Sequence, residues 1–378
     1  MFVKIVHRSA LQTIGLLAGI ALAGAALLAW PQAVATGVSR GLSICSTVII
    51  PSLFPFLVLA GFLVRSGLCR RLGRWLEKPT RRLFGLPGCC AGAILIGWVG
   101  GYPAGGAAIG ELTREGSITP DQGKRMLRFC VNGGPAFIVS AVGAAMMGHI
   151  AAGWVLFAAH ILASLLLGLG QQMIGGRRPA AADHPEMSAV PRTSLPTAFV
   201  ESVHTACRSL LYMCGFVVLF AALLSLCDVS GITTFFQYLF TRPLALAGGD
   251  VNLLPSLFPG ILEVSCGCVE VARAGELAPF WLGFFLGWGG LSVHGQLAAS
   301  LQGLGLIDRR FFLARLLHGL LGGGLSMLLM RIVPLPLDVF SPLQDAVLAP
   351  YSTSAAASVA LLTMGAMLLV GRRKASSD

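Results

Sequence analysis

The residue best suited to chemistry is Glu263, which lies within the apolar run Leu254 to Ala272, LPSLFPGILEVSCGCVEVA. A carboxylate at bilayer depth costs at least about 2.5 kcal/mol to insert, so an acid in such a run marks a functional site by default. The other candidates at this break are Ser265, Cys266 and Gly267. We expect Glu263 to take up a proton or coupling cation, or to accept a hydrogen bond from a substrate. The alternative is that it is neutral, or pairs with Arg273, and only holds the segment in place.

A second broken run, residues 88 to 112 (GCCAGAILIGWVGGYPAGGAAIGEL), stands in the corresponding position of the first half. Its turn residues are Gly100, Gly101, Tyr102 and Pro103, which include the residue types that supply unusual backbone angles and free carbonyls. Basic segments flank this run on both sides, so it enters the membrane and returns as a hairpin rather than crossing. Paired broken segments of this kind indicate a transporter's binding site.

Polar and glycine residues also follow each hairpin. After the first, VNGGPAF contributes Asn132, Gly133 and Gly134; after the second, WGGLSVHGQ contributes Ser292, His294 and Gln296. Four residues separate Ser292 from Gln296, so the two share a helix face, while His294 is displaced to another side. These groups line a water-filled cavity, or they serve as hydrogen-bonding contacts between helices.

Composition defines the class of protein. Hydrophobic residues make up 55% of the 378 positions and charged residues 11%, and the mean hydropathy is +0.80. Soluble domains are usually about 25% charged, so this is a polytopic membrane protein. The net charge of +11 comes from short clusters between apolar segments, which is typical of cytoplasmic loops and argues against nucleic-acid binding.

Sequence motifs for nucleotide and metal binding are absent. The chain contains no P-loop or HExxH motif and no CxxC pair, and His294 has no second His or Cys at i+3 or i+4. We therefore expect neither an enzyme nor a metal site, and no cofactor beyond a coupling ion of unknown identity.

The chain divides into five parts: an N-terminal transmembrane helix (1–41), a first repeat (42–173, hairpin 88–112), a cytoplasmic linker (174–206), a second repeat (207–333, hairpin 254–272) and a C-terminal helix with a basic tail (334–378). The expected spans, about eight by length, are 10–30, 44–64, 127–149, 151–173, 208–227, 277–300, 312–330 and 355–371. Residues 31–43 are expected to form an exposed link, and 229–250 an amphipathic one.

The two halves are weakly similar. Phe129, Gly133 and Gly134 match Phe285, Gly289 and Gly290, and His160 matches His318. Each half holds an odd number of crossings, so the second half is inserted upside down. With both termini inside, every Lys and Arg except Arg40, Arg242, Arg273 and Arg331 lies on the cytoplasmic side, which favours two re-entrant hairpins over two further spans. The predicted fold is all-α, an inverted-topology repeat.

Four motifs carry a family resemblance: PSLFPFLVLAGFLVRSG (51–67), GWVGGYPAGG (97–106), GILEVSCG (260–267) and GGLSVHGQ (289–296). With them the chain resembles the YlbJ-type sporulation integral membrane proteins over residues 42–333. These carry the nucleoside-recognition Gate domain and are similar in arrangement to concentrative nucleoside transporters. The resemblance implies hairpins entering from opposite sides, with a substrate between their tips. The family's Thr-Asn pair after the hairpin glutamate is replaced here by Ser265 and Cys266.

The resemblance further implies a secondary transporter that moves dipicolinic acid across the outer forespore membrane. A nucleoside or nucleobase carrier is the first alternative, and a non-transporting membrane scaffold in sporulation is the second. The expected partners are the lipid bilayer, a small-molecule substrate, and either a second copy of the chain or other sporulation membrane proteins.

Overall fold

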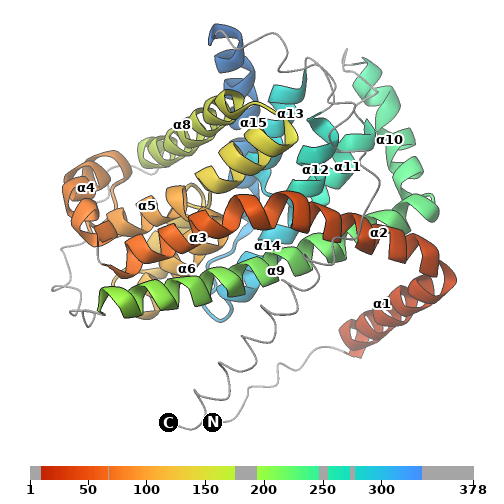
Figure 1. Ribbon diagram of the computed structural model, residues 1–378, viewed down its shortest axis with the longest axis horizontal. Helices are drawn as coiled ribbons and strands as arrows, with labels where there is room; N and C mark the ends of the chain where they lie inside the picture. The colour runs from red at the N-terminus through yellow and green to blue at the C-terminus, as the bar shows by residue number, and fades with distance from the viewer. Residues whose placement is uncertain (1–9, 67, 175–193, 247–253, 273–276, 334–378) are drawn as a thin grey trace.

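The computed structural model describes residues 10–66, 68–174, 194–246, 254–272 and 277–333, and every regular element in these ranges is a helix (Figure 1). Four helices there are long and apolar enough to cross a bilayer: Pro31–Phe62, Ile150–Ile174, Leu195–Val229 and Arg309–Ile332. The expected helix 355–371 and most of the linker 174–206 lie outside the described residues. The predicted all-helical membrane fold is confirmed.

Both broken runs form helical hairpins. In the first, α5 (Cys90–Val99) and α6 (Gly101–Arg114) meet at Gly100, and Gly101 has a φ of +83°. In the second, α11 (Leu254–Leu262) and α12 (Val264–Val271) meet at Glu263, whose backbone is extended. Within each hairpin a glycine pair lets the two arms approach closely. The pairs are Gly97 with Gly105, and Gly260 with Gly267.

The segments after the hairpins were predicted to be continuous spans, 127–149 and 277–300, and this was wrong. The first is interrupted by a non-helical stretch, residues 128–135, between α7 (Pro120–Leu127) and the π-helix η2 (Ala136–Met146). The second divides into α13 (Ala278–Trp288) and α14 (Gly290–Ser300), because Gly289 and Gly290 both adopt positive φ angles, +85° and +76°. Glycine supplies such angles without steric cost, so the Gly289–Gly290 pair breaks the second segment.

The N-terminal part was also predicted incorrectly between residues 31 and 43, which are helical rather than an exposed link. There α2 (Pro31–Ile44) follows α1 (Ala10–Ala29) and continues through the π-turn η1 (Cys45–Ile49) into α3 (Ile50–Arg65). A Cβ on Gly37 would lie 2.6 Å from the Ala221 carbonyl oxygen, so α2 packs backbone to backbone on α9 (Leu195–Val229). Small residues allow such close approach between membrane helices.

One further boundary differs from the prediction. Helix α9 begins at Leu195, capped by Ser194, so the linker ends well before 206. The expected amphipathic link at 229–250 contains the helix α10 (Ile232–Leu246). Arg40 of α2 forms an ion pair with Glu270 of α12, which ties the second hairpin to the N-terminal part of the chain.

The long helices support the hairpins. In Figure 1, α3 and α9 run side by side across the middle and lower part of the view, and α8 (Ile150–Ile174) and α15 (Arg309–Ile332) lie above them and pack against each other. A Cβ on Gly287 of α13 would lie 2.6 Å from the Gly319 nitrogen of α15, another glycine-mediated contact. The basic helix α4 (Leu68–Phe84) connects α3 to the first hairpin.

Candidate binding site between the hairpin tips

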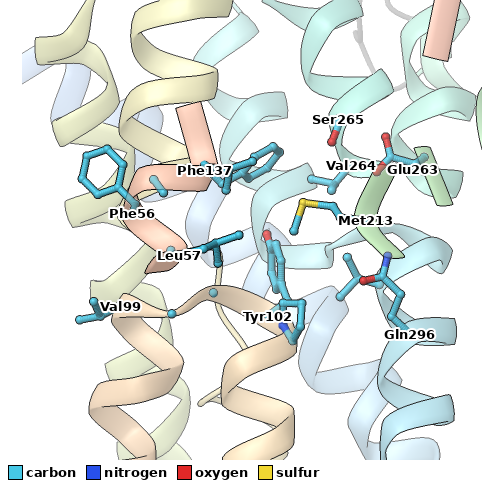
Figure 2. A pocket seen from close by; sticks show the side chains of 17 residues that line it. Phe56, Leu57, Val99, Tyr102, Phe137, Met213, Glu263, Val264, Ser265 and Gln296 are labelled. Carbon is cyan, nitrogen blue, oxygen red and sulfur yellow. The ribbon is translucent and has the colours of Figure 1, made fainter. Parts of the chain in front are cut away.

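A cavity lies where the two hairpin tips approach each other. In Figure 2, Tyr102 stands in the middle of the view, with Glu263 and Ser265 above it and Gln296 beside it. The predicted residues that line the cavity are Gly100, Gly101, Tyr102, Pro103, Gly134, Glu263, Ser265 and Gln296. The others, which do not line it, are Asn132, Gly133, Cys266, Gly267, Ser292 and His294.

The tip of the first hairpin supplies one wall. Helix α6 starts at Gly101 without a side-chain cap, and its first turn borders the cavity. The first amides of a helix have no partner within the helix and carry its positive dipole end. Tyr102 points its hydroxyl across to the second repeat, where it donates to the Leu286 carbonyl at 2.5 Å. This tip therefore places an uncapped helix start beside an anchored aromatic ring.

The tip of the second hairpin is organised by Glu263, whose side chain is only 3% exposed. Its Oε2 accepts a hydrogen bond from the Cys266 N–H at 2.7 Å and so caps α12. A Cβ on Gly290 would lie 3.1 Å from the Glu263 Cα, which places the uncapped start of α14 against this tip. The carboxylate is thus surrounded by helix starts. The alternative partner, Arg273, lies outside the described residues.

Of the non-helical stretch 128–135 between α7 and η2, the last part reaches the cavity. Gly134 lines the cavity, and a Cβ there would lie 2.8 Å from the Val99 carbonyl oxygen and 3.1 Å from the Gly101 nitrogen. Asn132 is fully buried, and its Nδ2 donates to the Phe129 carbonyl at 2.9 Å. Asn132 therefore supports the local backbone, and Gly134 forms the contact with the hairpin tip.

The second interrupted helix divides its polar residues in a similar way. Gln296 lines the cavity. His294 turns back, and its Nε2 lies 2.9 Å from the Trp288 carbonyl oxygen, so Nε2 carries a proton and donates to a group freed by the break. Trp288 Nε1 donates to the Ile261 carbonyl of the second hairpin at 3.0 Å. The Ser292 hydroxyl is buried with no partner among the described residues.

Most of the cavity wall is apolar, and sequence reasoning missed this part. Leu53, Phe56 and Leu57 come from α3, Ala136 and Phe137 from η2, and Met213 from α9. No local pattern distinguishes these residues from other apolar residues of a membrane span. Only the three-dimensional contact of α3, η2 and α9 with the tips reveals them.

The electrostatics of the cavity are simple. Glu263 is the only Asp, Glu, Lys, Arg or His among the lining residues. The described residues hold no group of three or more His, Cys, Asp or Glu side chains that could bind a metal ion. A ligand with a charged group would therefore contact backbone amides, hydroxyls and Gln296 rather than a basic side chain.

Comparison with known proteins agrees with this arrangement. Residues 46–153 match the Gate family model, described as "Nucleoside recognition". The chain is 27% identical over 326 residues to the sporulation integral membrane protein YlbJ of Bacillus subtilis (strain 168), covering 81% of this chain and 80% of that protein. The resemblance read from the four motifs is confirmed.

Solved structures of a concentrative nucleoside transporter, CNTnw, share the fold. An inward-facing substrate-bound state of CNTnw matches with a TM-score of 0.54 at 12% identity, covering 82% of this chain and 87% of that chain. An outward-facing state of a CNTnw double variant matches with a TM-score of 0.52 at 13% identity, covering 83% and 86%. The chain thus shares with CNTnw a helical membrane fold with an inverted repeat and two re-entrant hairpins.

Proposed function

We propose that this relative of a sporulation membrane protein is a secondary transporter that binds a small planar aromatic acid, dipicolinate, between its hairpin tips. The supporting observation is the difference between the two tips. Helix α12 already has its own anion, because the Glu263 carboxylate caps it. Helix α6 has no side-chain cap and opens into the cavity.

A substrate carboxylate would fill the open position. Backbone N–H groups at a helix start bind carboxylates and phosphates well. The apolar wall formed by Leu57, Phe137 and Met213 suits the flat ring that such an acid carries. With Glu263 protonated or bound to a cation, the second carboxylate would meet no opposing charge on the wall.

A nucleoside or nucleobase is the second candidate, and a specific observation favours it. The cavity has no basic side chain, whereas Glu263, Gln296 and Ser265 offer uncharged and acidic hydrogen-bonding groups of the kind that bind a base edge. The two candidates therefore differ in charge, because dipicolinate carries two carboxylates and a nucleoside is uncharged.

Binding to the purified protein separates the candidates. Thermal unfolding in detergent would be followed with dipicolinate, with uridine, and with benzoate as a control that has one carboxylate. We expect dipicolinate to raise the midpoint, because a ligand that binds only the folded state stabilises it. A rise with uridine alone would replace the dipicolinate proposal with the second candidate. No rise with any of the three, from well-folded protein, would favour a scaffold role.

The cellular setting follows from the same proposal. We place the protein in the outer forespore membrane with both termini in the cytoplasm, and we propose a proton or cation bound at Glu263 as the coupling ion. Self-association and contact with other sporulation membrane proteins belong to this proposal too.

A further inference from the structure

The stretch between α7 and η2, residues 128–135, lies in the protein interior and is not helical, although the Phe129 and Cys130 N–H groups still donate to the Met126 carbonyl oxygen. Backbone groups in a membrane interior must find partners within the protein, so each group in this stretch needs one. The Phe129 carbonyl accepts from Ser164 Oγ at 2.6 Å as well as from Asn132. The Gly133 N–H donates to His160 Nε2 at 3.1 Å. Side chains of α8 therefore hold one side of the stretch.

The other side is held by Arg315 of α15, which is 1% exposed. Its guanidinium donates to the Val131 carbonyl and, at 2.7 Å, to the Arg128 carbonyl. Both carbonyls follow the end of α7, where a helix carries its negative dipole end. Among the described residues no carboxylate forms an ion pair with Arg315; the ion pair nearby joins Arg128 to Asp308.

An arginine at this depth is costly unless its donors are satisfied. Here two main-chain carbonyls accept from Nη1 and Nη2, while Nε has no partner among the described residues. Both carbonyls belong to the first repeat, whereas Arg315 belongs to the second. The stretch ends at Gly134, which packs against the first hairpin tip and lines the cavity. Arg315 thus holds the first part of this stretch, and the last part of the same stretch forms part of the cavity wall.

We propose that Arg315, together with His160, is a positioning residue for the binding site: it holds residues 128–134 so that Gly134 forms the wall opposite the first hairpin tip. The proposal rests on the proposed binding function, since it assigns Arg315 an effect on ligand affinity without contact with the ligand. Arg315 is also the residue through which the second repeat sets the shape of a wall built by the first.

Hydrogen exchange of the purified protein tests the first step without any ligand. Arg315→Met removes the charge and both hydrogen bonds, Arg315→Lys keeps the charge, and Arg310→Met is the matched control at an exposed position of the same helix. Arg315→Met should speed exchange in peptides covering residues 128–134 by about tenfold, with Arg315→Lys in between and Arg310→Met unchanged. Unchanged exchange there in folded Arg315→Met protein would overturn the proposal.

Ligand affinity tests the second step. The dissociation constant for dipicolinate, or for uridine if that is what the wild type binds, should rise about tenfold in Arg315→Met and recover in part in Arg315→Lys. Faster exchange with unchanged affinity would overturn the positioning role. If the wild type binds neither probe, the proposed function fails, and the exchange experiment alone still decides whether Arg315 holds the stretch.

A second variant covers the case in which Arg315→Met does not fold. His160→Leu removes the acceptor of the Gly133 N–H and keeps a residue of similar bulk. Faster exchange at residues 128–134 together with weaker binding would support the proposal from the α8 side. Wild-type exchange and affinity in folded His160→Leu protein would contradict it.

Discussion

The rings of His160 and His318 stack on each other, with centroids 4.4 Å apart and planes inclined by 25°. The two residues match when the halves of the sequence are laid together, and they lie on the corresponding helices α8 and α15. Two equivalent residues can touch only close to the axis that relates the repeats. His318 Nε2 also lies 3.1 Å from the His160 carbonyl oxygen, so the contact joins the two halves by hydrogen bond as well as by stacking.

Replacing Tyr102 with Phe should loosen the first hairpin tip. The substitution keeps the ring and removes the hydrogen bond to the Leu286 carbonyl. We expect the free energy of unfolding to fall by about 0.5–1.5 kcal/mol, and ligand binding to weaken. Denaturant unfolding and a binding titration measure the two effects. Tyr238→Phe, at an exposed site on α10, is the control; equal effects of the two variants would contradict the assigned role of Tyr102.

Replacing Gly134 with Ala should force the first hairpin tip away from the interrupted helix. The new methyl group would lie 2.8 Å from the Val99 carbonyl oxygen, a backbone atom that cannot turn aside. Such overpacking costs about 1–3 kcal/mol, and we expect a loss of affinity of at least about tenfold. Gly92 lies in α5 of the first hairpin, and a Cβ there would meet no atom within 4 Å, so Gly92→Ala should bind like the wild type. Normal binding by Gly134→Ala would remove this wall from the site.

Replacing Gly37 with Ala tests the helix that was predicted to be a link. Its methyl group would lie 2.6 Å from the Ala221 oxygen and 2.7 Å from the Ala222 Cα. We expect a loss of about 1–3 kcal/mol in stability with the cavity unchanged. Thermal unfolding measures the loss, and Gly24→Ala on α1, with no atom within 4 Å, serves as its control. Unfolding like that of the wild type would mean that α2 does not pack on α9.

Replacing Glu263 separates its capping role from its chemical one. Gln keeps an oxygen that can accept from the Cys266 N–H, whereas Leu does not. Loss of a helix cap costs about 1 kcal/mol, so Glu263→Leu should be less stable than Glu263→Gln. We expect both variants to lose transport, because neither carries a titratable acid. Thermal unfolding ranks the two, and equal stability would contradict the capping role.

The hairpins were predictable because prolines and glycines interrupt both apolar runs, and basic segments on both sides of the first run argue against a crossing. The helix breaks after them were not. Residues 127–149 and 277–300 are long and apolar, so length alone reads them as spans. Gly133 and Gly134 were recognised as candidate site residues, and Gly289 and Gly290 as their matches in the second repeat. A glycine pair in a membrane helix is equally compatible with close packing.

Arg315 shows why the remainder was beyond the sequence. Its acceptors are main-chain carbonyls more than 180 residues earlier in the chain, and every residue type has a carbonyl, so no residue pattern encodes the pairing. The apolar cavity wall could not be predicted for the same reason, because no residue pattern identifies the side chains that form it. Conversely Glu263 was identifiable, because a buried acid in an apolar segment is rare and needs a reason.

The most direct test of the central claim is uptake of radiolabelled dipicolinate into proteoliposomes that contain the wild type, Glu263→Gln or, as a matched control, Glu270→Gln. Glu270 lies on the same hairpin, part-exposed and paired with Arg40, and does not line the cavity. We predict accumulation by the wild type and by Glu270→Gln, and none by Glu263→Gln, with all three proteins folded in the vesicles. Accumulation by Glu263→Gln at the wild-type rate, or no accumulation of dipicolinate by the wild type, would contradict the account.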